Sequence, residues 1–113
     1  MLPRPGFRAA VIEIELADAI RDAWNHAHDV RAYMAWVYRL ERTLRECFTS
    51  PPIERLYTDR FWHITAGAVR GDDPEMIRLE IEVQLEWLGI VLAAVQKMRA
   101  RFGEPAGEPR QAA

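Results

Sequence analysis

Apolar side chains recur at helical spacing in two segments of the first half of the chain. In residues 9–27 they share one side of a helical projection, and charged residues take the other side. Residues 30–48 show the cleanest stripe of this kind. Its members are Val30, Tyr33, Met34, Val37, Leu40, Leu44 and Cys47. The pattern predicts two amphipathic helices, or one continuous kinked helix, because neither Gly nor Pro separates the two segments.

A third segment follows a break that the turn residues mark. Ser50 precedes Pro51 and Pro52, and a serine N-cap with proline at the first helical position is a common helix start. Apolar residues then share one side of a helical projection as far as Ala68. We therefore expect a third helix that begins at Pro51 and weakens at Gly67.

The fourth segment runs from Pro74 to Phe102 and contains a stretch with two interpretations. Residues 77–87 alternate apolar and polar side chains, which is typical of a half-buried strand. As a strand they would form a hairpin at about 61–85 and give an α+β domain. Strong helix formers throughout the segment favour a helix instead. Such a helix carries apolar side chains on two faces, so neighbouring helices or a partner chain must cover both.

The favoured fold is an all-α, four-helix up-down bundle that forms a dimer. Its helices occupy a single domain over residues 8–102. Residues 1–7 contain two prolines and a glycine and are expected to form a flexible leader. Residues 103–113 have little apolar content, so we expect a disordered tail there.

Composition excludes several classes of protein. Half of the 113 residues are hydrophobic and 28% are charged, which excludes an intrinsically disordered chain. The net charge of −2 argues against a nucleic-acid partner and a polybasic membrane surface. Glu13 and Glu15 interrupt any signal peptide, and the longest uncharged apolar run is about half of a bilayer span. With one cysteine and fourteen arginines to one lysine, we expect a cytoplasmic protein of bacterial-like composition.

Motifs for several kinds of chemistry are absent from the sequence. The single serine, Ser50, lies before two prolines and outside any nucleophile elbow, and no glycine-rich phosphate loop occurs. His26 and His28 are two residues apart, so on a helix they point away from each other and cannot share an ion. The Glu-x-x-His pairs of di-iron bundles are also missing. We therefore expect neither a metal nor a cofactor.

One short segment suggests an enzyme instead. Arg21-Asp-Ala-Trp-Asn-His26 resembles the Arg-x(4–6)-His element of HEPN ribonucleases, over six residues. Those proteins are helical bundles that dimerise to bring their Arg and His together over RNA. The resemblance implies an RNA-cutting toxin, with His26 as general acid and base and Arg21 as the group that stabilises phosphate. Asp22 would be the polar residue that follows the arginine.

The densest group of polar and aromatic residues lies at positions 57–63. A functional interpretation makes Asp59, Arg60, Trp62 and His63 the ligand site of a small-molecule regulator, with Trp for stacking and Arg for an anion. The favoured interpretation is structural. It places one aromatic side chain in the core and Trp62 in a subunit contact, and it pairs Asp59 with Arg60.

Charges are distributed unevenly along the chain. Residues 30–48 carry four arginines against two glutamates, and residues 72–86 carry six acids against one arginine. In a bundle these segments could lie side by side or meet across a two-fold axis.

The tryptophans point to an interface, because they do not share one stripe. Trp36 stands off the main apolar side of its segment, and so does Trp62. Tryptophan and arginine are enriched in the energetic centres of interfaces. The leading hypothesis is a non-enzymatic helical interaction module that acts as a homodimer or as a subunit of a larger assembly. Its expected interface residues are Trp36, Arg60, Trp62, His63 and Trp87.

Overall fold

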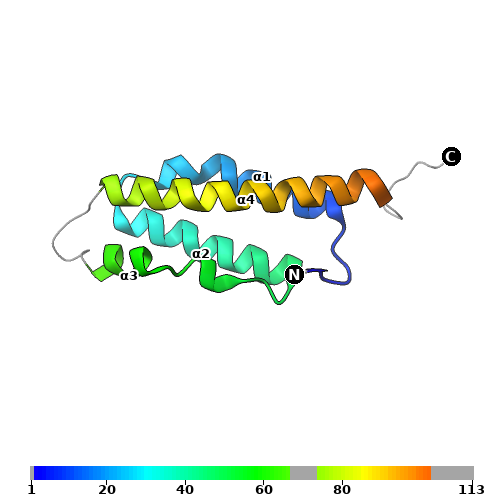
Figure 1. Ribbon diagram of the computed structural model, residues 1–113, viewed down its shortest axis with the longest axis horizontal. Coiled ribbons are helices and arrows are strands. Elements are labelled where there is room, and N and C mark those ends of the chain that lie inside the picture. Colours follow the sequence, from blue (N-terminus) through cyan, green and yellow to red (C-terminus); the bar gives the residue numbers. More distant parts are fainter. Residues whose placement is uncertain (1, 67–73, 103–113) are drawn as a thin grey trace.

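The computed structural model describes residues 2–66 and 74–102 (Figure 1). Its elements in chain order are β1 (Leu2–Pro3), α1 (Ala9–Asp22), the 3-10 helix η1 (Ala23–His26), α2 (Val30–Cys47), β2 (Phe48–Thr49), the 3-10 helix η2 (Ile53–Arg55), α3 (Asp59–Ala66) and α4 (Pro74–Phe102). With 81% of the structure helical, the all-α prediction is confirmed. Residues 77–87 lie inside α4, so the alternative of a hairpin at 61–85 is wrong. The expected tail at 103–113 lies outside the described residues.

The longest helix, α4, has 29 residues and is therefore about 44 Å long. Figure 1 shows α1 lying along α4, α2 beside them, and α3 at the edge of the molecule beside the first part of α2. The directions of α1 and α4 are opposite. Glu13 near the start of α1 meets Arg99 near the end of α4, and Trp24 just after α1 meets Arg78 near the start of α4.

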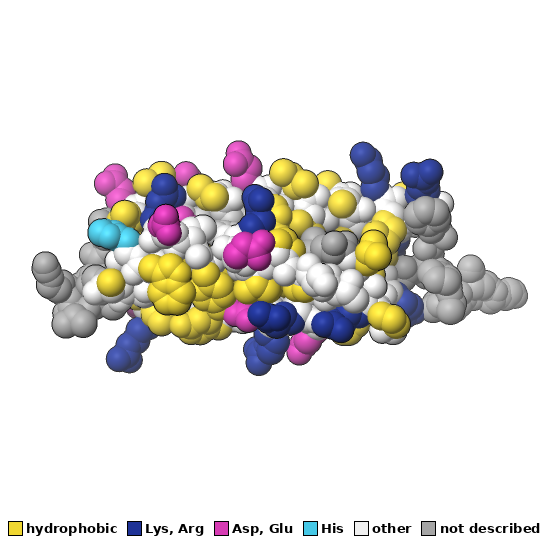
Figure 2. Space-filling view, turned by 60° about the horizontal axis from the view of Figure 1, so that its bottom comes forward, with side chains coloured by type: hydrophobic (Ala, Val, Ile, Leu, Met, Phe, Trp, Pro, Cys, Tyr) yellow, Lys and Arg dark blue, Asp and Glu magenta, His cyan; other side chains and the backbone are white. Residues whose placement is uncertain are grey.

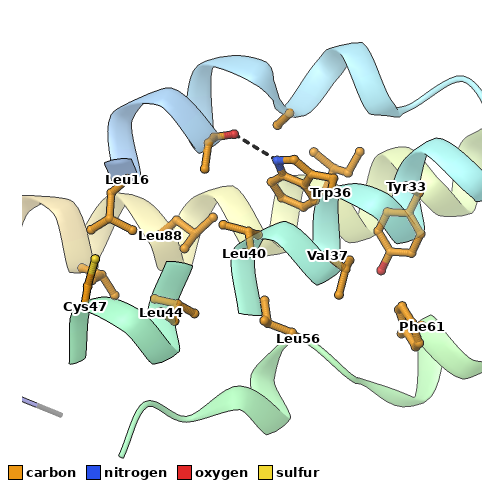
Figure 3. Packing of buried hydrophobic residues seen from close by; sticks show 14 of the residues in the cluster. Leu16, Tyr33, Trp36, Val37, Leu40, Leu44, Cys47, Leu56, Phe61 and Leu88 are labelled. Atoms are coloured by element: carbon orange, nitrogen blue, oxygen red, sulfur yellow. Dashed lines mark hydrogen bonds between the residues drawn. The ribbon is translucent and has the colours of Figure 1, made fainter. Parts of the chain in front are cut away.

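The second helix forms the centre of the core because other elements cover it on two sides. Figure 3 shows its side chains packing toward Leu16 of α1 and Leu88 of α4 in one direction, and toward Leu56 and Phe61 in the other. The buried arc of α2 is therefore wider than the single stripe that the sequence indicated. It comprises Val30, Tyr33, Trp36, Val37, Leu40, Thr43, Leu44 and Cys47.

Trp36 belongs to this core, so the expectation that it meets a partner is wrong. Its side chain is 0% exposed, and its indole N–H donates to the carbonyl of Ala19 in α1 at 3.0 Å (Figure 3). The physical reason is the packing of α1 against α2. A large ring one step away from the main stripe fills the contact between the two helices, and its polar N–H is satisfied there.

The first two helices are separate rather than one kinked helix. The chain tightens into η1 after Asp22, and α2 then begins anew at Val30. Asp29 has extended backbone angles, and its carboxylate accepts the backbone N–H of Ala32 at 2.7 Å. Neither Gly nor Pro separates α1 from α2, and the aspartate N-cap marks the start of the second helix instead.

The third helix begins later than the sequence predicted. Ser50 has a φ of 48° and follows strand β2, so a helix that begins at Pro51 is wrong. The prolines lead into η2 instead. The helix α3 begins at Asp59, after Thr58, whose hydroxyl oxygen accepts the backbone N–H of Phe61 at 3.0 Å.

The leader lies against the end of α2. Leu2 and Pro3 pair in antiparallel register with Thr49 and Phe48. Arg4 then donates its backbone N–H to the carbonyl of Cys47 at 2.8 Å, and its Nε donates to the carbonyl of Arg45 at 2.6 Å. Residues of the expected leader thereby satisfy carbonyl groups at the end of α2, where a helix has no partners of its own.

Candidate functional site

The alternating segment of α4 splits its apolar side chains between the core and the surface. Ile77 and Ile81 are buried, whereas Leu79 and Val83 are 49% and 47% exposed. Ile90, further along the same side of the helix, is 68% exposed. The strand-like alternation thus arises from a helix with two apolar faces, one of which is left uncovered within the described part of the chain.

We call this uncovered side the outer face of α4. Its members are exposed residues three or four positions apart along the helix, together with Val83, which follows Glu82 directly. They are Glu75, Leu79, Glu82, Val83, Glu86, Ile90, Ala93 and Lys97. Individually exposed apolar side chains are normal on a protein surface. Three large ones along one side of one helix form a patch, which is the usual mark of an interaction site.

Trp87 borders the outer face through a small pocket. The pocket has a volume of about 160 Å³, and Arg55, Thr58, Val83, Gln84 and Trp87 line it. The guanidinium of Arg55 lies 5.0 Å from the centre of the Trp87 ring, a cation–π contact that keeps the indole half-buried. Trp87 was among the expected interface residues, and the structure places it beside Val83.

Arg60 from the 57–63 segment takes part in a buried polar network. The carboxylate of Glu80 on α4 is 1% exposed and accepts from Arg60 at 3.1 Å and from the Thr58 hydroxyl at 2.5 Å. Gln84, one turn along α4, donates to the carbonyl of Arg55 at 2.6 Å. Arg60 therefore holds α3 to α4. The carboxylate that it meets is that of Glu80, whereas the sequence suggested Asp59.

Trp62 and His63 lie on the exposed side of α3. Trp62 is 59% exposed, and its ring stacks on Tyr57 with centroids 5.9 Å apart and an interplanar angle of 27°. Tyr38 of α2 continues the group at 6.4 Å from Tyr57. Figure 2 shows hydrophobic side chains gathered over this part of α2 and α3. The structure thus gathers aromatic side chains here, away from the outer face of α4.

Tyr57 also links this aromatic group to a charged side chain, the carboxylate of Glu41. Its hydroxyl donates to Glu41, and this hydrogen bond, followed by that from Arg45, holds the pKa of the Glu41 carboxyl below its usual value. Burial raises the pKa of Tyr57 itself, and the adjacent carboxylate raises it further. At neutral pH the pair therefore consists of a phenol that donates and a carboxylate that accepts.

Arg21 and His26, the two residues of the HEPN-like element, lie at a shallow cleft with a volume of about 490 Å³. Arg21 lines the cleft and is paired with Asp18. His26 lies beside it, with Nε2 2.8 Å from a carboxylate oxygen of Asp22 and Nδ1 2.8 Å from the carbonyl of Ala32. Asp22 also accepts from Arg39 of α2 at 3.1 Å. Both ring nitrogens and the Arg21 guanidinium therefore have partners within the protein.

Over 2–66 and 74–102, no group of three or more His, Cys, Asp and Glu side chains could hold a metal ion. In the same residues, no helix combines the length and the apolar character that crossing a bilayer requires. Cys47 is buried, and burial raises the pKa of its thiol to about 11.

Comparison of the chain with protein-family models, with curated proteins and with solved structures found no match. What the protein does is therefore inferred from its own surfaces. Among these, the outer face of α4 contains the second apolar face that the alternation at 77–87 indicated. Leu79, Val83 and Ile90 were not among the expected interface residues, of which only Trp87 belongs to α4.

Proposed function

We propose that the protein is a helical interaction module that self-associates through the outer face of α4. One observation carries the proposal: Leu79, Val83 and Ile90 leave about half or more of their side chains exposed along one side of a single helix. A monomer gains nothing from this arrangement. Covering the patch with another protein surface would remove the apolar area from water, which is the main favourable term in association.

Two-fold symmetry makes such a patch effective. In a symmetric dimer the same surface occurs on both copies, so every apolar contact counts twice. Complete burial of an aliphatic side chain contributes about 1.5–3 kcal/mol, and half-exposed side chains have roughly half of that still to gain. Trp87 borders the patch and belongs to the same proposed contact. Trp62 and His63 lie on α3 and belong to a different surface.

The nuclease and ligand-binding alternatives have less support in the geometry. In the HEPN-like element, Arg21 is neutralised by Asp18, and His26 lies between a carboxylate and a carbonyl. His26 is therefore held at both ring nitrogens by groups of the protein itself, and Arg21 forms an ion pair with the residue three positions before it. In the 57–63 segment, Arg60 is committed to Glu80 and so is not available to an anion. The outer face of α4, by contrast, has apolar side chains that are still exposed.

Size-exclusion chromatography with light scattering tests the proposal. The expected mass at micromolar concentration is twice that of the 13.1 kDa chain. Ile90→Glu places two carboxylates in the contact and should raise the dissociation constant at least tenfold, about 1.4 kcal/mol. Ile14→Glu is the matched control, because Ile14 on α1 is 61% exposed and lies off this face. A monomeric wild type, or a dimer that only Ile14→Glu dissociates, would contradict the proposal.

A further inference from the structure

The outer face of α4 changes its charge from one end to the other. Its first half carries Glu75, Glu82 and Glu86, and its second half carries Lys97. Arg101 adds a further positive charge in the last turn. Figure 2 shows acidic and hydrophobic side chains alternating along one part of its upper edge, with basic side chains just below them, and further basic side chains toward the other end of that edge. The apolar patch thus lies within a strip that is negative at one end and positive at the other.

We propose that the partner on this face is a second copy of the chain, with the two α4 helices antiparallel about a two-fold axis near Ile90. The inference rests on the proposed function and adds the relative orientation of the two copies and the position of the axis. Antiparallel pairing brings the acidic half of each helix against the basic half of the other. Parallel pairing would place like charges together, which disfavours that arrangement. The dipoles of the two helices also favour opposite directions.

The axis position follows from the spacing of the outer face. With Ile90 on the axis, residues equally far before and after it lie opposite each other, so Val83 faces Lys97 of the other copy. Lys97 of one copy then lies between Glu82 and Glu86 of its partner. Its aliphatic stem can cover Val83 while the ammonium group reaches both carboxylates. Each charged contact occurs twice because of the symmetry.

Small residues around Ile90 permit the close approach that helix packing needs. Gly89, Ala93 and Ala94 are all exposed next to Ile90. A Cβ placed on Gly89 would meet nothing within 4 Å, so the space beside the helix is open there. Helices that pack in contact have axes about 8–10 Å apart, and small side chains at the crossing allow the shorter distances.

Disulfide trapping of the full chain tests the orientation. Ile90→Cys should link to itself on mild oxidation, because the axis brings the two copies of this position together. Val83→Cys alone should not link, because its two copies lie about 21 Å apart along the helices, far beyond the roughly 7 Å that a disulfide spans. An equimolar mixture of Val83→Cys and Lys97→Cys should link as a heterodimer. Wild type and Ala35→Cys, an exposed site on α2, control for Cys47 and for random collision.

The outcomes separate the two proposals. A wild type that is monomeric by light scattering overturns the proposed function and this inference together. A dimer in which Val83→Cys links to itself overturns the antiparallel orientation and leaves the proposed function standing. The same holds for a dimer in which Ile90→Cys fails to link.

Charge reversal supplies a second test. Lys97→Glu should raise the dissociation constant of the dimer at least tenfold, and so should the double variant Glu82→Lys, Glu86→Lys. Mixing the two variants should restore association, because all four pairs of opposite charge are present in the heterodimer. Unchanged association of both variants, or mixing without recovery, would overturn the proposed charge pairing. Arg42→Glu on α2 is the control for a change of net charge away from the face.

Discussion

At the scale of single residues, Trp36 joins α1 and α2, the first two α-helices along the chain. Its ring lies between α1 and α2, and its N–H is bonded to Ala19. Trp36→Phe removes this hydrogen bond and leaves a void, so we expect a loss of about 1–3 kcal/mol in the free energy of unfolding. Urea denaturation followed by circular dichroism measures it. Trp62→Phe, at an exposed site, should change stability by less than about 0.5 kcal/mol. Equal losses in the two variants would contradict a core role for Trp36.

Glu41 provides a prediction of pH dependence. Its folded-state pKa lies below the usual value of 4.5, chiefly through the Tyr57 hydrogen bond. A depressed pKa contributes stability above the unfolded-state value, and this contribution is lost as the pH falls through the folded-state value. Tyr57→Phe should raise the pKa of Glu41 toward 4.5 and reduce the difference in stability between neutral and acidic pH. Carbon-detected NMR titration of the Glu41 carboxyl measures the change.

A matched control for this titration lies next to Tyr57. Tyr38→Phe removes a hydroxyl group from the same aromatic group, and the hydrogen bond to Glu41 comes from Tyr57. We expect the Tyr38 variant to leave the Glu41 pKa where it is in the wild type. If Tyr57→Phe also left it there, the Tyr57 hydroxyl would not be the cause of the lowered pKa.

At the scale of elements, the start of α2 depends on Asp29. Its carboxylate satisfies the backbone N–H of Ala32, which has no partner within the helix. Asp29→Ala should lower the free energy of unfolding by about 1 kcal/mol. His28→Ala is the control, because it removes only an exposed ion pair with the same aspartate. A loss confined to the His28 variant would contradict the capping role.

The helices differ in how well the sequence predicts them, for physical reasons. Periodicity predicts the extent of α2, and Pro74 at the first position marks the start of α4. The start of α3 is missed. The Ser50–Pro51 signal is locally correct for a helix, but pairing with β1 holds the preceding residues extended. That pairing comes from residues far away in the chain, which a local signal does not contain.

The candidate site shows the same division between local and long-range information. The alternation at 77–87 already contains the two apolar faces of α4, so exposure of Leu79 and Val83 was predictable once the segment was taken as a helix. The burial of Trp36 and the attachment of Arg60 to Glu80 were not. Both depend on which helices lie beside α2 and α3, and periodicity within one segment does not specify its neighbours.

At the scale of the whole molecule, self-association should appear in the thermal stability. A dimer that unfolds to two separate chains is stabilised by mass action, so its midpoint rises with protein concentration. For two chains of 113 residues we expect a rise of about 3 °C for each tenfold increase. Differential scanning calorimetry over a hundredfold range measures it. Ile90→Glu should unfold at a midpoint independent of concentration, and a flat response in the wild type would contradict the dimer.

The attachment of Arg4 to the end of α2 has a consequence for the order in which the molecule folds. The contact joins residues separated by 41 positions, so the entropy of closing that loop must be lost before the contact contributes. Most of α2 needs only local hydrogen bonds and can form earlier. The carbonyls of Arg45 and Cys47 gain their partners from Arg4 only when the leader docks. Pulse-labelled hydrogen exchange should therefore show the Arg4 amide becoming protected after the amides of α2, and protection of Arg4 together with the middle of α2 would contradict that order.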